Sequence, residues 1–355
     1  MLVNHNFHMV DNHTLLCYES PNNAGAIVQN LIEQYVQEAL ENGGIAHSKA
    51  QALLGIEDAL LPLLFSGAAQ LRDHHQGRAV RLCAIVNAKS GRCPEDCSFC
   101  AQSAHHQTQI ETYPLMDPHE ILARAEEAVA MGARRFSIVT SGKALTEQEF
   151  VQLTHAIRLM QERTRLTLCA SVGMLTPERA HALRAAGLNR YHHNLETAAS
   201  FFPQVCTTHR YEEDLDTLRA AHEAGLEICS GGIFGLGESP EQRLELAYTL
   251  KEMAVDSVPL NFLNPIPGTP LASANTLTPL EILKFVALFR FILPDKDIRI
   301  CGGREFGLRD LHPLVFWAGA NGIMIGNYLT TRGRDYQADL QMIRDLGMEV
   351  VNGNE

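Results

Sequence analysis

Hydrophobic and polar positions follow different periods on the two sides of Gly77. Before Gly77, apolar residues such as Ile27, Leu31 and Tyr35 recur at roughly helical spacing, and the segments "SKAQALLGI" and "DALLPLLFSGAAQLRDHH" are helical in pattern as well. After Gly77, short β-rich runs alternate with longer amphipathic runs. The pattern therefore predicts a group of N-terminal helices followed by a repeated strand–helix unit.

Eight short runs predict strands, and helical runs separate them. Most helical runs, for example 117–132 and 239–254, begin with Ser, Thr or Asp at an N-cap position, and several end at Gly. Eight strands with helical crossovers predict a (β/α)8 barrel with its active site at the C-terminal ends of the strands. A doubly wound open sheet is the main alternative, but eight regular repeats over about 250 residues favour closure. The predicted strands are residues 80–86, 135–140, 166–172, 190–195, 227–234, 257–263, 298–303 and 322–326.

The change of period also predicts how the chain is organised. We expect a flexible N-terminal tail over residues 1–24, a helical N-terminal cap over residues 25–77, and the barrel domain over residues 78–355. No segment contains the roughly 20 consecutive apolar residues that a membrane helix needs. The N-terminus lacks the basic region and long apolar segment of a secretory signal.

Charge and cysteine content narrow the expected partners. The formal charge of −12 argues against a phosphate-binding surface, so we expect no nucleic-acid partner and no membrane partner. The chain has nine cysteines, an odd number, and three of them lie within residues 93–100. This pattern indicates metal or redox chemistry in a cytoplasmic protein rather than a disulfide framework.

Cys93, Cys97 and Cys100 form a C-x3-C-x2-C motif in the loop after the first predicted strand. A structural zinc site would need a fourth ligand, for which His105 and His106 are candidates. A ferredoxin-type cluster would need a fourth nearby cysteine. The motif resembles instead the radical S-adenosylmethionine (SAM) superfamily. The resemblance implies a [4Fe–4S] cluster with one iron left open for the amine and carboxylate of SAM, whose cleavage releases a 5′-deoxyadenosyl radical.

Further segments narrow the resemblance. In order along the chain, "NAKSGRCPEDCSFCAQS", "NRYHHNLET", "GLEICSGGIFGLGE", "SVPLNFL", "GTPLA" and "IRICGGRE" resemble the biotin synthase family from about Gly77 to residue 350. The resemblance implies a transferase that inserts sulfur into dethiobiotin to form biotin, with two SAM cleavages and sulfur from a second iron–sulfur cluster. It also implies a homodimer and a reducing partner such as flavodoxin or ferredoxin.

The ligands of the second cluster depart from the family pattern. The resemblance implies a [2Fe–2S] cluster with Cys169, Cys229 and Arg299 among its ligands, but Ser137 stands where the family usually has a cysteine. Because side chains alternate along a strand, Cys301 faces the same side as Arg299. Our hypothesis is that Cys169, Cys229 and Cys301 hold an auxiliary cluster of altered type or position; the alternative is that Cys301 is a small buried hydrophobe. No role is predicted for Cys17, Cys83 and Cys206.

Contacts to SAM and to the substrate follow from the same resemblance. Asn194 and Glu196 match positions that bind SAM, and Asn194 also matches a contact to dethiobiotin. Asn261 matches a contact to the substrate ring, and an amide suits a cyclic urea; a core asparagine satisfied by backbone is the alternative. His192 replaces a more usual asparagine. Asp214 stands where the family commonly has an arginine near the SAM carboxylate, and a like-charged residue there would repel that carboxylate. We therefore expect that another group neutralises it or that the loop differs.

Two alternative functions remain at this point. The first is another radical SAM enzyme on the same scaffold, such as a hydrogenase-maturation or methylornithine-synthase-like relative. The second is a non-catalytic zinc-binding protein.

Overall fold

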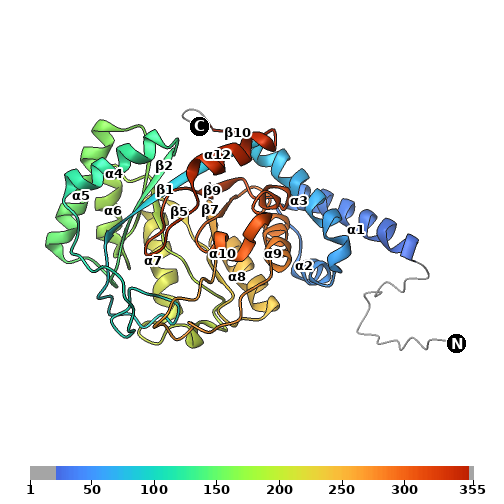
Figure 1. Ribbon diagram of the computed structural model, residues 1–355, viewed down its shortest axis with the longest axis horizontal. Coiled ribbons are helices and arrows are strands. Elements are labelled where there is room, and N and C mark those ends of the chain that lie inside the picture. The colour runs from blue at the N-terminus through green and yellow to red at the C-terminus, as the bar shows by residue number, and fades with distance from the viewer. Residues whose placement is uncertain (1–20, 352–355) are drawn as a thin grey trace.

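A closed parallel barrel forms the centre of the chain (Figure 1), as seen in a computed structural model that describes residues 21–351. All its strand pairs are parallel, in the order β1-β2-β3-β4-β5-β7-β8-β9, and β9 pairs with β1 to close the barrel. This closure confirms the predicted barrel and excludes the open sheet. The strands are β1 (Ala79–Lys89), β2 (Arg135–Thr140), β3 (Thr167–Ser171), β4 (Arg190–His192), β5 (Glu227–Cys229), β6 (Gly232–Phe234), β7 (Ser257–Phe262), β8 (Asp297–Ile300) and β9 (Gly322–Met324).

The predicted strand 227–234 is interrupted. Its first part, β5, pairs with β4 and at one residue with β7, and its second part, β6, pairs with β7 and forms a bridge with Glu196. Gly231 lies in the break, where a Cβ atom would come within 2.0 Å of the Pro259 carbonyl oxygen. The sequence therefore needs glycine here, because the chain passes against its neighbour more closely than a side chain allows.

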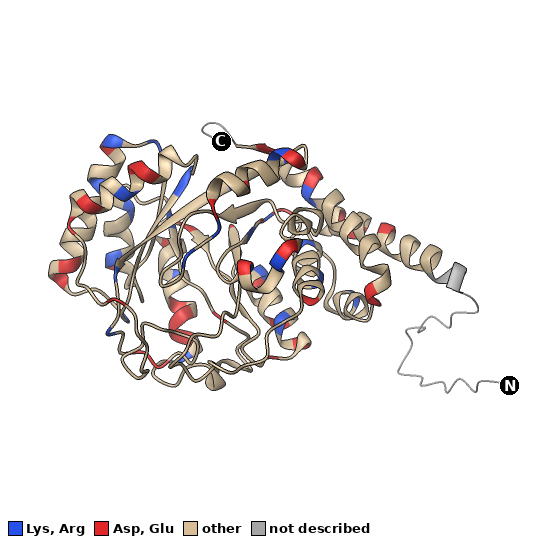
Figure 2. Cartoon of the chain, in the orientation of Figure 1, with Lys and Arg blue, Asp and Glu red and all other residues tan. Residues whose placement is uncertain are grey.

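Helices surround the barrel between successive strands, as the sequence predicts (Figure 1). Capping boxes begin several of them; the hydroxyls of Thr146, Ser239 and Thr278 each accept a hydrogen bond from the backbone N–H three residues on. Acidic and basic residues are interspersed on these helices (Figure 2). The helices are α4 (Pro118–Ala130), α5 (Glu147–Arg163), α6 (Pro177–Ala185), α7 (Tyr211–Glu223), α8 (Pro240–Glu252) and α9 (Pro279–Ile292).

The N-terminal helices pack on the outside of the barrel next to α9. They are α1 (Pro21–Asn42), α2 (His47–Leu54), η1 (Asp58–Leu60) and α3 (Leu61–Gln76), and α3 contacts both α1 and α9. Covered by these helices and by the barrel, α9 is buried over most of its length, including Phe285, Phe289 and Phe291. Residues 1–20 of the predicted tail lie outside the described residues.

The C-terminal segment completes the barrel. It contains α10 (Arg304–Leu308), η3 (Arg309–Leu311), α11 (Leu314–Trp317), α12 (Tyr336–Asp345) and β10 (Glu349–Val350), and β10 pairs with the start of β1. Within residues 21–351, no helix alone has the length and apolar character to cross a membrane, although α2 together with the segment Asp58–Gln76, bent by 108°, passes the same test.

Candidate active site

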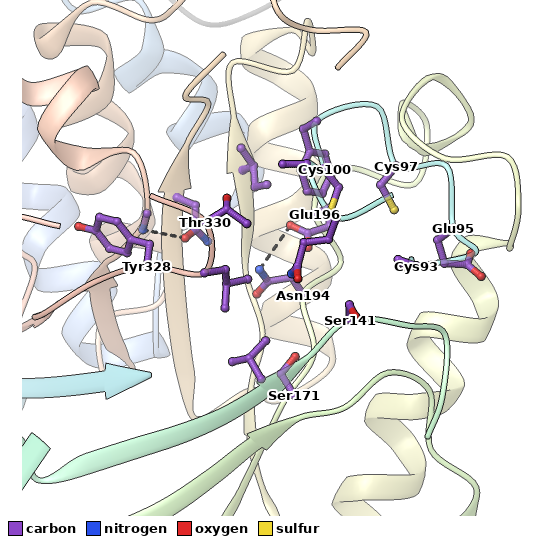
Figure 3. Close-up of a pocket in the computed structure, with 18 of the residues that line it drawn as sticks. Cys93, Glu95, Cys97, Cys100, Ser141, Ser171, Asn194, Glu196, Tyr328 and Thr330 are labelled. Carbon is purple, nitrogen blue, oxygen red and sulfur yellow. Dashed lines mark hydrogen bonds between the residues drawn. The ribbon is translucent and has the colours of Figure 1, made fainter. Parts of the chain in front are cut away.

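A cavity of about 390 Å³ opens at the C-terminal ends of the barrel strands, where the sequence predicts the active site. We call it the upper cavity. The loop after β1 lines one side of it and the segment after β9 lines another, so that Cys93, Cys97 and Cys100 stand opposite Tyr328 and Thr330 in Figure 3. Its volume suits a small-molecule ligand.

The cysteine motif is held in a compact loop by its own backbone. The N–H of Cys93 donates to the Gln102 carbonyl at 3.0 Å, and the N–H of Ala104 donates to the Cys93 carbonyl at 2.8 Å. A tighter turn joins Cys100 N–H to the Cys97 carbonyl at 2.9 Å. The loop therefore brings the three predicted cysteines together at one side of the upper cavity.

The chemistry of these thiols fits a multi-iron cluster. Burial raises the pKa of Cys93 and raises that of Cys100 to about 11, and a hydrogen bond with Cys206 together with burial raises the pKa of Cys97. Thiols with such pKa values stay protonated at neutral pH unless a metal takes the place of the proton. The three-thiol set thus fits a group that brings positive charge into the loop.

The two histidines that a zinc site would use face elsewhere. His105 Nε2 is 2.9 Å from the Pro94 carbonyl, and His106 Nε2 is 3.1 Å from the Cys97 carbonyl. Both rings are engaged by backbone oxygens rather than directed at the cysteine sulfurs. This geometry does not support the zinc alternative.

A polar cluster that the sequence did not predict fastens the loop to the segment before α7. Glu95 Oε2 accepts a hydrogen bond from His209 Nδ1, and Cys206 Sγ lies 3.3 Å from the same nitrogen. The Ser98 N–H donates to the Val205 carbonyl at 2.9 Å. Donor atoms of Glu95, Cys206 and His209 lie within 4.8 Å of one another, a spacing that could hold a metal ion, but each already has hydrogen-bond partners. We interpret the cluster as a brace.

Asp214 lies between two histidines. Its Oδ1 lies 2.8 Å from His193 Nε2 and its Oδ2 lies 3.2 Å from His209 Nε2. Although burial opposes it, hydrogen bonding to Asp214 and Cys206 raises the pKa of His209 to about 11. His209 is therefore a cation at neutral pH. In the sequence, the short polar segment "CTTH" before α7 was the only indication that His209 could take part in the site.

Asn194 and Glu196 lie together in the upper cavity, beside the cysteine loop (Figure 3). Asn194 Nδ2 donates to Glu196 Oε2 at 3.3 Å. The backbone of Glu196 has φ +63°, and its carbonyl accepts from Ile233 N–H at 2.8 Å. A Cβ on Gly232 would come within 2.4 Å of that carbonyl oxygen. Burial raises the pKa of Glu196 to about 8.

Asn261 lines the same cavity, and the backbone fixes its amide. Its Oδ1 accepts from Gly302 N–H at 2.9 Å, and its Nδ2 donates to the Gly232 carbonyl at 3.2 Å. An amide has two donor hydrogens and two acceptor lone pairs. The backbone contacts agree with the alternative of a core asparagine, and one hydrogen and one lone pair of Asn261 remain available to a ligand.

A second, smaller cavity of about 30 Å³ lies deeper in the barrel, and we call it the lower cavity. Its wall includes Ser137 and Arg299, as the sequence expected for an auxiliary site. It also includes four cysteines, namely Cys83 of β1, Cys169 of β3, Cys229 of β5 and Cys301 after β8.

Cys83 is the residue of this set to which the sequence assigned no role. It packs directly against Cys301, and the contact between the two thiols lowers the pKa of Cys83. Burial raises the pKa of Cys169 and of Cys229 to about 12. In the structure, Cys83 faces the same side of β1 as Ile85, two residues further on, and both line the lower cavity.

Buried polar atoms without partners mark the lower cavity as a ligand site. Among the described residues of its wall, Ser137 Oγ and Arg299 Nε are buried and make no hydrogen bond. Unpaired buried donors are costly, so such atoms indicate a missing acceptor. Arg299 Nη2 instead donates to Asp297 Oδ2 at 3.1 Å. Four thiols and two unpaired polar groups fit an iron–sulfur cluster with sulfide acceptors.

Comparison with known proteins gives two family matches and a set of close relatives. Residues 88–250 match the Radical SAM superfamily, and residues 259–349 match the Biotin and Thiamin Synthesis associated domain. A biotin synthase of Geobacter sulfurreducens is 53% identical over 326 residues, covering 92% of this chain and 99% of the relative. The biotin synthase of Pelotomaculum thermopropionicum is 49% identical over 322 residues, covering 91% and 99%.

Solved structures share the barrel at much lower identity. A methylornithine synthase superposes with a TM-score of 0.78 at 20% identity, covering 91% of this chain and 97% of that one. The FeFe-hydrogenase maturase of Carboxydothermus hydrogenoformans gives a TM-score of 0.76 at 18% identity, covering 92% and 80%. These likenesses show the fold alone, so the alternative radical SAM function is not favoured over the one that the close relatives share.

Proposed function

The chain belongs to the biotin synthase family and is a radical SAM enzyme of biotin synthesis, and we propose that its two cavities hold two different iron–sulfur clusters. The observation that carries the proposal is the arrangement of the cysteines. Three line the upper cavity on one loop, and four line the lower cavity on three separate strands and directly after a fourth. The substrate of the family is dethiobiotin, and the upper cavity is the space in which we place it.

Cys93, Cys97 and Cys100 would hold the [4Fe–4S] cluster in the upper cavity. When bound, that cluster and SAM supply the radical chemistry that removes hydrogen from unactivated carbons. The brace between Glu95 and His209 fixes the loop in position. The role of these residues is to keep three thiolates converging on one side of the cavity.

Asn194 and Glu196 would bind SAM, and Asn194 would also contact dethiobiotin. Both project into the upper cavity from the end of β4, and the hydrogen bond between them limits their movement. An acidic side chain suits the hydroxyls of a ribose. Asn261 would bind the ring of dethiobiotin with the amide hydrogen and lone pair that the backbone leaves unused.

Cys83, Cys169, Cys229 and Cys301 would hold the auxiliary cluster in the lower cavity, close to Arg299. This set adds Cys83 to the three cysteines inferred from the sequence, and so supplies a fourth thiol where Ser137 replaces the usual one. When bound, the auxiliary cluster would supply the sulfur atom. The role of Arg299 is to place positive charge beside the thiolates while Asp297 holds its other end.

The remaining partners follow from family membership. We place the protein in the cytoplasm as a homodimer that receives electrons from a reducing protein such as flavodoxin or ferredoxin. Chemical reductant replaces that protein in the test below.

Anaerobic turnover tests the proposed function. The reconstituted full-length protein is incubated with SAM, dithionite and dethiobiotin, and biotin and 5′-deoxyadenosine are measured by mass spectrometry. Biotin formation that depends on all three additions is expected. Formation of 5′-deoxyadenosine without biotin would keep the radical SAM assignment and reject the substrate.

A further inference from the structure

The upper and lower cavities share a wall inside the barrel. Among the described residues, three side chains line both cavities, namely Ile85 of β1, His192 of β4 and Met324 of β9. Two of the three are apolar, so His192 is the polar member of the wall. If dethiobiotin occupies the upper cavity and sulfur comes from the lower one, whatever passes between them meets these side chains.

His192 stands in a column of polar side chains along β4. Arg190 lies at the lower end of the column, where its charge acts on the thiols of Cys169 and Cys229. Asn194 lies at the upper end, inside the upper cavity. Residues two apart on a strand point to the same face. Asn194 lies beyond the end of β4, but its side chain contacts that of His192, so it points to the same side as well. His192 therefore connects the two cavities.

A directed chain of hydrogen bonds begins at His192. Its Nε2 lies 3.0 Å from Asn194 Oδ1, and Asn194 Nδ2 donates to Glu196 Oε2 at 3.3 Å. Because an amide oxygen can only accept, the hydrogen in this contact belongs to His192 Nε2. The amide of Asn194 is held in one orientation as a result.

We propose that His192 is a positioning residue for sulfur insertion: its ring closes the wall between the two cavities, and its Nε2–H fixes the amide of Asn194 toward the substrate. The inference rests on the proposed function and deepens it. It separates two properties of one side chain, its size and its hydrogen bond. A histidine that merely fills space in a core would show only the first.

The role of size is tested by cysteine alkylation in the metal-free, full-length chain under reducing, anaerobic conditions. Iodoacetamide, which is small and uncharged, is added, and modification of each cysteine peptide is followed by mass spectrometry. His192→Ala is expected to speed modification of the four lower-cavity cysteines several-fold, whereas His192→Phe, which keeps a ring, leaves their rates near wild type. Cys206 lines the upper cavity and serves as the internal reference. Unchanged rates in His192→Ala, or an equal rise at Cys206, would show that the ring of His192 does not separate the two cavities.

The role of the hydrogen bond is tested in the reconstituted enzyme by the ratio of 5′-deoxyadenosine to biotin. His192→Phe keeps the size but loses the N–H, and the ratio is expected to rise about tenfold, the factor that corresponds to loss of one hydrogen bond. His192→Gln restores a donor toward Asn194 and is expected to bring the ratio back toward wild type. A wild-type ratio in His192→Phe would overturn the positioning role.

The two measurements keep this inference distinct from the proposed function. If wild-type protein cleaves SAM but makes no biotin, the proposed function fails while the alkylation rates still report on the wall. If wild-type protein makes biotin and the His192 variants match it in both measurements, the proposed function stands and the inference fails.

Discussion

The upper cavity takes its three cysteines from one short loop, residues 93–100, whereas the lower cavity takes its four from strands that span residues 83–301. The loop cysteines owe their positions to local turns and to the brace at Glu95. The strand cysteines owe theirs to the pairing register of the whole barrel. A change in a loop can alter the upper site alone, but the lower site can change only by exchanging one inward-facing residue for another, as the pair Ser137 and Cys83 suggests.

The two cavities also differ in charge. Acidic groups of the upper cavity include Glu95, Glu196 and Asp214, and Lys143 is its one Lys or Arg among the described residues. The lower cavity instead has Arg299 in its wall, with Arg190 close to its thiols. His209 pairs with both Glu95 and Asp214, and burial favours the protonated form of Glu196, so the acidic groups of the upper cavity are largely compensated. The lower cavity is basic, which favours an anionic cluster.

The largest effect is expected for Cys97→Ala, which removes one of the three loop thiolates. The variant should lose the iron of the upper cluster and form neither 5′-deoxyadenosine nor biotin, while lower-cavity iron is retained. Iron analysis and Mössbauer spectroscopy after anaerobic reconstitution measure this. Cys206→Ser is the matched control, since Cys206 contacts Cys97 but is not proposed as a ligand, and it should keep both clusters. Loss of all iron in Cys97→Ala would show that the two sites do not assemble independently.

The next largest effect is expected for a cysteine of the lower cavity, whose loss should remove the auxiliary cluster and leave the upper one. Cys83→Ala should lose the auxiliary cluster and biotin formation while it still cleaves SAM to 5′-deoxyadenosine, because the loop cysteines are untouched. Ser137→Ala removes a hydroxyl from the same cavity wall and is expected to keep the cluster. Mössbauer spectra of Cys83→Ala or of Cys301→Ala that retain the wild-type auxiliary signal would reject the four-thiolate site.

The barrel itself could be predicted from sequence because period and capping are local signals. All eight predicted strand runs overlap observed strands, and β2 matches its predicted range. The break between β5 and β6 could not be foreseen, because it depends on the approach of Gly231 to the Pro259 carbonyl of another strand. Such contacts are set by packing between distant segments rather than by propensity.

The same division applies to the sites. Cys93, Cys97 and Cys100 share one loop, so their spacing alone indicates a common site. Cys83 could not be assigned, because β1 is buried on both faces and the sequence does not say which alternate residues point into the barrel. Likewise, His209 neutralises Asp214 only because the segment before α7 folds against the cysteine loop.

A third prediction tests whether the arginines beside the lower cavity need one carboxylate, that of Asp297, to stabilise the fold. Asp297 is buried and accepts from Arg135 and Arg299, with Arg81 Nη1 3.3 Å from its Oδ1. Asp297→Asn leaves these charges without their partner and should lower the free energy of unfolding by about 3–5 kcal/mol.

Urea denaturation of the metal-free chain measures this change. Asp216→Asn is the control, because Asp216 pairs with Arg219 on the exposed face of α7 and its loss should cost only about 0.5 kcal/mol or less. Equal destabilisation by the two variants would contradict a special role for Asp297.

The smallest effect is expected from the upper cavity, at Glu196. Its pKa is raised from the ordinary value of 4.5 to about 8, so the folded chain binds a proton there more tightly than the unfolded chain does. Between about pH 4.5 and pH 8, stability from this residue therefore falls as pH rises, by an amount on the order of 1 kcal/mol for a partly buried carboxyl. Glu196→Gln removes the titration, so the difference in unfolding free energy between wild type and variant should change with pH across this window. Glu212→Gln, on the exposed side of α7, should track wild type. A pH-independent difference for Glu196→Gln would mean that the carboxyl ionises at its ordinary pKa and is already an anion at neutral pH before SAM binds.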